Sequence, residues 1–376
     1  MKKKLKKILQ FLWNLRRRRI AQRFYRIKSL KYLEKNNISN EYIDGENAYV
    51  AFWSRFPEKI ETESYRFFSR YMGKVPHIVP EYIGELYLER YLNPVRYRDF
   101  YSDKNLYSQY MPHINTPKTA LRRIDGGQLL NENYDSFLNK GFSCSCEDFE
   151  SYLKKYQDLI FKPSVDTDSG VGVVKFFRKE NGFFNSNNEK LSLQYLMSSN
   201  DFILQEAVQQ HPFFSKLCDT SVNTMRLCLY RSVKTEQIHL TGGIVRIGRK
   251  GTFVDNAHAG GRFVGINVSD GTLMKTTLDQ YGCKTDVWND IDYSHEKLKI
   301  PCWEKIRKFA LDVSLQNRHC RLIALDISLD VNENPVLIEE NIGGFSYWLL
   351  EMTGQDPFGG FANEVVEYCL KKMSEK

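Results

Sequence analysis

The sequence predicts a folded protein of the α+β class with a largely antiparallel sheet content. Of its 376 residues, 42% are hydrophobic and 14% are aromatic, and chains of this composition bury a core instead of staying disordered. After Asp103 the chain alternates between short β-type runs punctuated by glycine and helical runs, a texture typical of sheets covered by helices. No stretch approaches the roughly 18 apolar residues of a membrane-spanning helix, so we expect no such segment.

A basic arm opens the chain. Residues 1–33 contain thirteen Lys and Arg and no acidic residue, so with a total net charge of +8 the rest of the chain carries −5. Apolar side chains recur in the arm at helical spacing, widened by Phe11 and Trp13: Leu5, Ile8, Leu9, Leu12 and Leu15, and then Ile20, Phe24, Ile27 and Leu30. An apolar stripe backed by cations is typical of a helix that lies in a membrane interface.

Two other interpretations of the arm are open: a helix packed on its own domain, or an arm that neutralises nucleic-acid phosphates. We favour the membrane because the apolar face is too rich for a phosphate-binding tail. We therefore expect residues 1–35 to form a basic amphipathic helix that binds an anionic membrane surface through residues 1–33. No nucleic acid partner is expected.

Residues 36–102 are aromatic and mixed in charge, with helical runs at 63–71 and 84–92 between prolines. This segment predicts a small helical cap or docking domain. Eight cysteines are scattered without a CxxC pair, and no signal-peptide cleavage site follows the short apolar run at 8–15. We therefore expect a reducing, cytoplasmic location, peripheral on the inner face of the cytoplasmic membrane. Cys144 and Cys146 lack a second ligand pair, which favours free thiols over a metal site.

The rest of the chain predicts the sheets. The expected strands are 159–162, 172–177, 202–208, 225–230, 239–247, 322–329 and 336–340. The expected helices between and after them are 147–156, 191–198, 301–316 and 361–373.

Lys162 ends one of these strands and precedes a polar loop that contains Ser169, Gly170 and Gly172. Such a loop lets backbone N–H groups approach phosphate oxygens, while the lysine supplies a positive charge. The loop lacks the GxxxxGK[ST] order of a Walker P-loop. A plain hairpin with a glycine turn explains the segment equally well.

Two carboxylates near the C-terminus form the strongest local pattern. If the strands 322–329 and 336–340 form a hairpin centred on 332–333, Asp326 faces Glu339 with Cβ atoms about 5 Å apart. Asn341 shares a strand face with Glu339. Opposed like charges destabilise a strand pair unless they are neutralised, and oxygen ligands suit magnesium. The alternative, a solvated hairpin face with ordinary carboxylates, stays open.

Arginines lie between these segments. Arg226 sits on an alternating strand, and a glycine-rich stretch after Arg246 contains Asn256, His258 and Arg262. Such a set can bind an anionic transition state or a carboxylate substrate. The alternative is that these side chains decorate a surface loop, which for His258 alone is the favoured interpretation.

In this order, from about Asp103 to the C-terminus, the segments resemble the ATP-grasp superfamily, and in texture its sugar-transfer-associated branch. The resemblance implies an ATP-grasp fold, with two α+β subdomains at 103–208 and 209–376 gripping ATP, and with ATP and Mg2+ as cofactors. The implied ATP-binding residues are Lys104, Lys162, Ser169, Gly170, Gly172, Gln205, Glu206, Ala207 and Val208. The implied metal ligands are Asp326, Glu339 and Asn341, the implied catalytic residues Arg226, Arg262 and Lys162, and the implied substrate-binding residues Arg246, Asn256 and His258.

The chain departs from the superfamily pattern in two places. Where many members carry a carboxylate for the ribose, this chain has Val222, Asn223 and Thr224, so Asp219 or another group would hold the ribose. A full Rossmann-like domain before Asp103 is not evident.

The resemblance implies an ATP-dependent carboxylate-amine ligase with an acylphosphate intermediate. The family name suggests surface polysaccharide assembly, in which a uronic acid on a small or lipid-linked saccharide would be joined to an amine such as an amino acid. Two alternatives remain: a phosphotransferase of the same fold, and a membrane-bound scaffold that binds nucleotide without chemistry.

Overall fold

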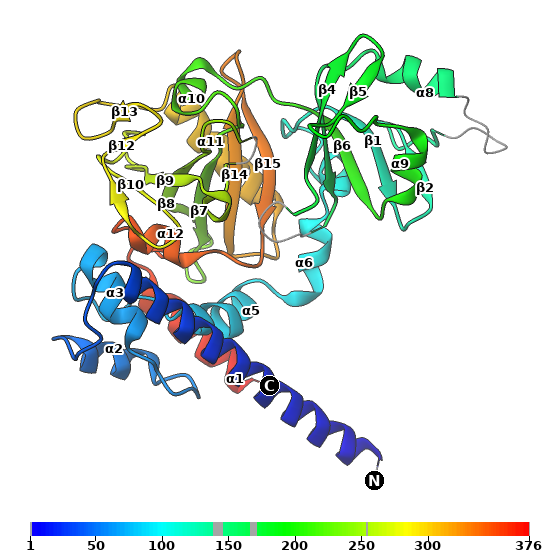
Figure 1. Ribbon diagram of the computed structural model, residues 1–376. Coiled ribbons are helices and arrows are strands. Elements are labelled where there is room, and N and C mark those ends of the chain that lie inside the picture. The colour runs from blue at the N-terminus through cyan, green and yellow to red at the C-terminus, as the bar shows by residue number, and fades with distance from the viewer. Residues whose placement is uncertain (1, 138–145, 166–170, 253–254, 376) are drawn as a thin grey trace.

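The computed structural model describes residues 2–137, 146–165, 171–252 and 255–375, with side chains from residue 15 onward and, in the second range, from residue 149. Two antiparallel sheets form two lobes, and a group of helices lies below the larger lobe (Figure 1). The predicted α+β class and its antiparallel sheets are confirmed.

The smaller lobe contains a six-stranded sheet with the order β2-β1-β6-β3-β4-β5. Its strands are β1 (Thr119–Ile124), β2 (Gln128–Leu130), β3 (Leu159–Pro163), β4 (Val174–Lys179), β5 (Gly182–Phe184) and β6 (Phe202–Glu206). Helices α8 (Cys146–Leu153) and α9 (Leu193–Ser198) accompany it. Aromatic residues such as Phe149, Phe176 and Phe202 bury together in its core.

The larger lobe contains a seven-stranded sheet with the order β11-β10-β9-β8-β7-β14-β15. Its strands are β7 (Met225–Arg231), β8 (Ile238–Ile247), β9 (Arg262–Gly265), β10 (Thr277–Leu278), β11 (Lys284–Thr285), β14 (Leu322–Leu329) and β15 (Pro335–Asn341). A separate pair is β12 (Val287–Trp288) with β13 (Ile291–Asp292). Helix α10 (Pro212–Leu217) and a 3₁₀ turn, η4 (Ala257–Ala259), lie in its connections.

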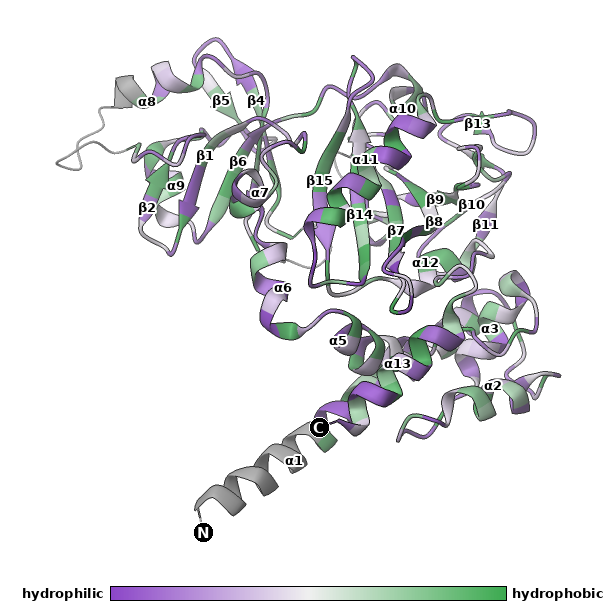
Figure 2. Cartoon of the chain, turned by 180° about the vertical axis from the view of Figure 1, so that it is seen from behind, coloured by the Kyte–Doolittle hydropathy of each residue, from purple (hydrophilic) through white to green (hydrophobic). Residues whose placement is uncertain are grey.

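Both faces of the central strands are covered, and for this reason every residue of β14 is buried. Helix α11 (Trp303–Gln316) covers one face, where Ile306 packs with Leu325 (Figure 2). Alternate residues such as Ala324 face the helical group on the other side. The sheet is therefore sandwiched, as the alternation of a strand requires.

The helical group contains segments from both ends of the chain. From the N-terminal part come α1 (Lys2–Lys35), α2 (Glu46–Trp53), α3 (Glu63–Met72), α4 (Glu81–Ile83), a π-helical turn η1 (Gly84–Leu88) and α5 (Glu89–Leu92). From the C-terminal part come α12 (Tyr347–Met352) and α13 (Ala362–Ser374). Tyr49, Phe68, Tyr230 and Val366 belong to one continuous core. Residues 36–92 therefore bury their apolar side chains against the larger lobe.

A short connection leads from these helices to the smaller lobe. It consists of α6 (Val95–Ser102), a 3₁₀ turn η2 (Lys104–Leu106) and α7 (Tyr107–Tyr110). Within the described residues, no helix has the length and apolarity that crossing a membrane requires.

Candidate active site

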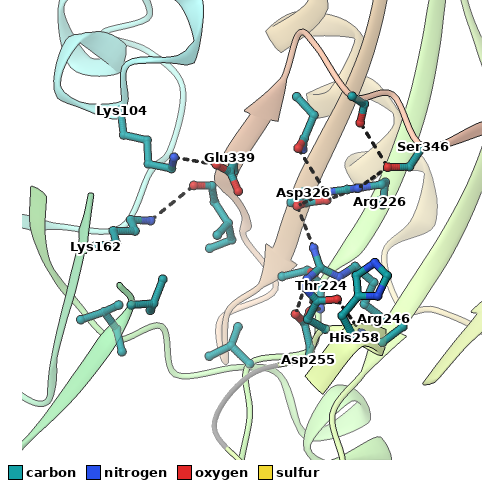
Figure 3. A pocket seen from close by; sticks show the side chains of 18 of the residues that line it. Lys104, Lys162, Thr224, Arg226, Arg246, Asp255, His258, Asp326, Glu339 and Ser346 are labelled. Carbon is teal, nitrogen blue, oxygen red and sulfur yellow. Dashed lines mark hydrogen bonds and ion pairs between the residues drawn. The ribbon is translucent and has the colours of Figure 1, made fainter. Parts of the chain in front are cut away.

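A pocket of about 510 Å³ lies between the two lobes and is lined by residues of both (Figure 3). The smaller lobe and η2 contribute Lys104, Lys162, Gln205 and Glu206. The larger lobe contributes the ends of its central strands and the loops beside them. The pocket has a lysine-lined end near the smaller lobe and an arginine-lined end over the larger sheet.

The lysine-lined end of the pocket contains an apolar slot. Its walls are formed by the side chains of Ile160, Val173, Val208 and Ile338. The buried amide of Gln205 donates from Nε2 to the Pro117 carbonyl at 3.1 Å, while its Oε1 has no partner among the described residues. An apolar slot lined also by Gln205, whose buried Oε1 has no hydrogen-bond partner among the described residues, suits a heterocyclic base.

The strand β6 ends at Glu206, two residues before the predicted end of the strand at 208. Glu206 lines the pocket, but its Oε1 accepts a hydrogen bond from the Gln157 N–H at 2.6 Å. Ala207 does not line the pocket, and its N–H donates to the Asp158 carbonyl at 2.8 Å. Of the four implied ATP-binding residues at 205–208, Gln205, Glu206 and Val208 line the pocket.

Two buried lysines lie side by side at this end. Lys104 Nζ forms an ion pair with Glu339 Oε1 at 2.6 Å, and Lys162 Nζ donates to the Ile338 carbonyl at 3.4 Å. Burial and the positive charge of Lys104 lower the pKa of Lys162 to about 7, although Glu339 opposes the shift. Glu339 pairs with Lys104, and no carboxylate of the described residues forms an ion pair with Lys162.

The predicted glycine loop is partly visible. Ser169 and Gly170 lie outside the described residues. Gly172 has a positive φ of 80°, and a Cβ there would approach the Pro163 ring at 3.1 Å, so glycine is favoured on both counts. Gly172 does not itself line the pocket, whereas the adjacent Val173 does.

The predicted pairing is confirmed, since Asp326 and Glu339 are direct partners in the β14–β15 ladder, although the register shifts by one residue between Asp326 and Ile327, so the pairs nearer the turn differ from the predicted ones. On its other side, Asp326 is the ladder partner of Arg226 on β7. Asp326 Oδ1 accepts from Arg226 Nε at 2.8 Å, and Oδ2 accepts from Arg226 Nη2 at 2.8 Å and Arg246 Nη1 at 3.0 Å. Burial raises the pKa of Asp326, but the two arginines lower it by more, so the pKa lies below its ordinary value.

These contacts change the argument for a metal. Arginines neutralise Asp326 and Lys104 neutralises Glu339, so repulsion between the two carboxylates does not by itself require a cation. The donor chemistry still fits magnesium, because two carboxylates and the Asn341 amide line one wall of the pocket and hard oxygen donors suit this ion. Within the described ranges there is no cluster of three or more His, Cys, Asp or Glu that could hold a metal.

Asn341 links the same network. Its Oδ1 accepts from Arg226 Nη2 at 3.2 Å, and its Nδ2 donates to the Ala324 carbonyl at 3.2 Å. Two of the three predicted metal ligands, Asp326 and Asn341, therefore contact one guanidinium group, whereas Glu339 pairs with Lys104.

The second end of the pocket contains a carboxylate that sequence reasoning did not select. Asp255 is buried and accepts from the Thr224 N–H at 3.0 Å and from Thr224 Oγ1 at 2.5 Å. It also pairs with Arg246 Nη2 at 2.9 Å. Burial raises the pKa of Asp255, and Arg246 opposes the shift. Arg246 therefore bridges Asp255 and Asp326 across the floor of the pocket (Figure 3).

The predicted substrate-binding residues Arg246, Asn256 and His258 all line this end. Asn256 Oδ1 accepts from the His258 N–H at 3.0 Å. The exposed His258 ring lies 5.9 Å from the Trp348 ring and shares a hydrogen bond with Gln280.

The structure does not bring the predicted catalytic residue Arg262 to the pocket. Its Nε donates to Thr277 Oγ1 at 3.1 Å, its Nη2 binds the Cys283 carbonyl, and the guanidinium lies over the Trp288 ring. The neighbouring residue Phe263 lines the pocket. Because successive side chains of a strand point to opposite faces, Arg262 faces away.

The loop after β15 completes the second end and is held by an N-terminal residue. Gly343, Gly344 and Ser346 line the pocket. Buried Glu89 accepts from the Gly344 N–H at 2.7 Å and from the Phe345 N–H at 3.1 Å. Burial raises the pKa of Glu89, while these backbone hydrogen bonds lower it. Sequence reasoning missed Glu89, which lies in a segment with no recognisable motif.

Comparison with known proteins places these features in a family context. A family model described as "Sugar-transfer associated ATP-grasp" matches residues 85–365. No protein of curated function matches the sequence significantly.

Three solved structures illustrate the similarity. An ATP-grasp ligase, PsnB, complexed with a minimal precursor is 10% identical over 74% of this chain and 63% of its own, with a TM-score of 0.38. An L-amino acid ligase from Bacillus licheniformis is 12% identical over 66% of this chain and 42% of its own, with a TM-score of 0.35. D-alanyl-alanine synthetase A from Vibrio cholerae O1 biovar eltor is 12% identical over 73% and 66%, with a TM-score of 0.38. The chain thus spans only part of the length of each.

Proposed function

Since the chain belongs to the sugar-transfer associated ATP-grasp family, we propose that it is an ATP-dependent carboxylate-amine ligase. The observation that carries this proposal is the composition of one pocket between two lobes. An apolar slot and two buried lysines lie at one end, two arginines with Asp326 and Asn341 lie at the other, and Glu339 stands between them in contact with Lys104. Such a pocket can hold a nucleoside triphosphate and a carboxylate end to end.

ATP is the first substrate in this proposal. Its base would occupy the slot between Ile160 and Ile338, and its phosphates would lie against Lys104 and Lys162. The pairing of Lys104 with Glu339 at 2.6 Å would then be exchanged, with the amine turning to a phosphate oxygen. A phosphate beside Lys162 would also restore the protonated form of this amine, because a nearby anion favours the charged state.

Asp326, Glu339 and Asn341 would hold magnesium. When bound, the ion supplies positive charge that offsets the phosphate oxygens. The arginines that pair with Asp326 would then become partly available to a second anion. That anion is the substrate carboxylate, which suits the fork of Arg246 and Arg226.

The chemistry requires no side-chain nucleophile. A carboxylate oxygen of the substrate attacks the γ-phosphorus of ATP, and the bond to the ADP oxygen breaks. The amine then attacks the carbonyl carbon of the acylphosphate, phosphate leaves, and the nitrogen loses a proton to give the amide. The contributions of Lys162, Arg226 and Arg246 are positioning and electrostatic stabilisation of the transferring group.

The substrate class and setting belong to the same proposal. The name of the family points to sugar transfer, so the carboxylate would be a uronic acid of a surface polysaccharide precursor, soluble or lipid-linked. A peripheral position on the inner face of the cytoplasmic membrane would bring the enzyme to such precursors.

The experiment is a screen of uronic-acid sugar nucleotides against amino acids, with ADP and phosphate release measured in the presence of magnesium. The proposal predicts turnover that needs both the carboxylate and the amine. Turnover that no amine affects, with a stable phosphorylated product, would instead identify a phosphotransferase. Nucleotide binding without any turnover across the screen would favour the scaffold. Glu339→Gln serves as the inactive control.

A further inference from the structure

Helix α1 has one face that is fixed to the protein. Tyr32 and Leu33 are each only 2% exposed and belong to the core shared with the larger lobe. Arg26 Nε pairs with Glu63 at 2.7 Å, and Lys28 Nζ pairs with Glu81 at 2.9 Å. This part of the helix is therefore held in one orientation, as the interpretation of a helix packed on its own domain predicts.

The opposite face of α1 is apolar and uncovered. Ile20, Phe24 and Ile27 are 59%, 60% and 55% exposed, and Leu30 follows at 36%. Their spacing places them along one side of a helix. Large apolar side chains this exposed and this regularly arranged mark an interaction surface.

Cations border this face. Arg16, Arg19 and Arg23 are exposed, and no ion pair joins them to the part of the chain that the structure describes. The only acidic residue of the helix is Glu34, near its C-terminal end. Toward its N-terminus the helix continues beyond the rest of the protein (Figure 1), and its first fourteen residues carry five more lysines.

The chemistry of this face selects among possible occupants. Nucleic acid would use the cations but would leave the apolar side chains in water. A second copy of the helix would bring two sets of arginines together, which is unfavourable. An anionic bilayer accepts the apolar side chains at the acyl boundary and the arginines among the head groups.

We propose that α1 docks on an anionic lipid bilayer through Ile20, Phe24, Ile27 and Leu30, with Arg16, Arg19 and Arg23 at the head groups. The docked helix lies against the substrate end of the pocket, because Lys28 Nζ is 5.1 Å from the Trp348 ring, which itself lines the pocket. This inference defines the surface behind the membrane part of the proposed function. It is tested by lipid binding alone, so ligase activity can fail while docking holds, and the reverse.

The test compares the full-length protein with the triple variant Ile20→Ser, Phe24→Ser, Ile27→Ser. Each protein is sedimented with vesicles of phosphatidylglycerol and phosphatidylcholine, and with vesicles of phosphatidylcholine alone. The matched control is Val287→Ser, Leu315→Ser, Val331→Ser, which removes three other exposed apolar side chains. Thermal unfolding checks that both triple variants fold.

We expect the wild type and the control to sediment with the anionic vesicles, and the α1 variant to partition at least about tenfold more weakly. Arg19→Ser, Arg23→Ser should weaken binding to the anionic vesicles and leave the small binding to neutral vesicles unchanged. Equal partitioning of the α1 variant and the wild type would overturn the inference. Failure of the wild type to sediment with either kind of vesicle, together with its retention on DNA, would also overturn the inference.

Discussion

Replacing Lys162 by methionine should make the folded protein more stable at neutral pH. The side chain is buried beside Lys104, and its pKa falls from 10.5 to about 7 because burial and the neighbouring charge disfavour the ammonium form. Since the folded-state pKa lies below the unfolded one, the unfolded chain binds more protons between these values, and stability rises with pH there. Methionine keeps a similar volume without the charge.

The expected size of the effect follows from the shift. Each unit of pKa corresponds to about 1.4 kcal/mol. The Lys162→Met variant should thus exceed the wild type by several kcal/mol in the free energy of unfolding at pH 7. The excess should narrow by about 1 kcal/mol between pH 7 and pH 8 and slightly more between pH 8 and pH 9, because the wild type gains stability as Lys162 loses its proton in the folded state.

Urea denaturation at pH 7, 8 and 9 measures this difference. The exposed Lys154→Met variant is the control, and its difference from the wild type should stay near zero at every pH. A difference for Lys162→Met that does not change with pH, or a variant less stable than the wild type at pH 7, would refute the claim that burial and Lys104 disfavour the charged form of Lys162. The same variant should bind ATP much more weakly, so that stability rises where function is lost.

Three further predictions concern the larger lobe. Glu89→Ala should lower the free energy of unfolding by about 3 kcal/mol, because it removes two charge-assisted hydrogen bonds to the N–H groups of Gly344 and Phe345. Glu89→Gln should recover part of this loss. Equal urea midpoints for the two variants would contradict this role of Glu89. Arg226→Met should destabilise the fold by about 3 to 5 kcal/mol, because Asp326 stays buried and loses its bidentate partner. Thermal or urea unfolding measures this loss, and a change under about 1 kcal/mol would contradict the prediction. Arg262→Ala should leave ATP affinity within about twofold of the wild type by calorimetry, because its guanidinium faces away from the pocket, and a loss of tenfold or more would return it to the site.

Local pattern accounts for what the sequence could predict. Alternating apolar residues in a short hairpin predict that Asp326 faces Glu339, and the structure has this pair, although a register shift beside it moves the pairs nearer the turn by one residue. The same reasoning went wrong for Arg262, because a glycine-rich loop with an arginine at its end does not reveal on which face the next strand begins. The neighbouring Phe263, an apolar residue facing the pocket, decides it.

Contacts between distant segments account for what the sequence could not predict. Glu89 and the Gly344 N–H that it binds are 255 residues apart, and nothing local marks either as a partner. Asp255 lies beside the predicted Asn256 and acquires its role only when β8 brings Arg246 to it. The sequence predicts a helical cap or docking domain at residues 36–102, but it does not reveal that the apolar side chains of these helices share one core with α12, α13 and the larger sheet.

The most direct test of the account measures the magnesium dependence of ATP binding by titration calorimetry in the wild type and in Glu339→Gln. We predict that magnesium tightens ATP binding to the wild type by at least about tenfold, and that this gain disappears in Glu339→Gln. The same gain in both proteins would contradict the claim that the β14–β15 carboxylates hold the ion that anchors the triphosphate.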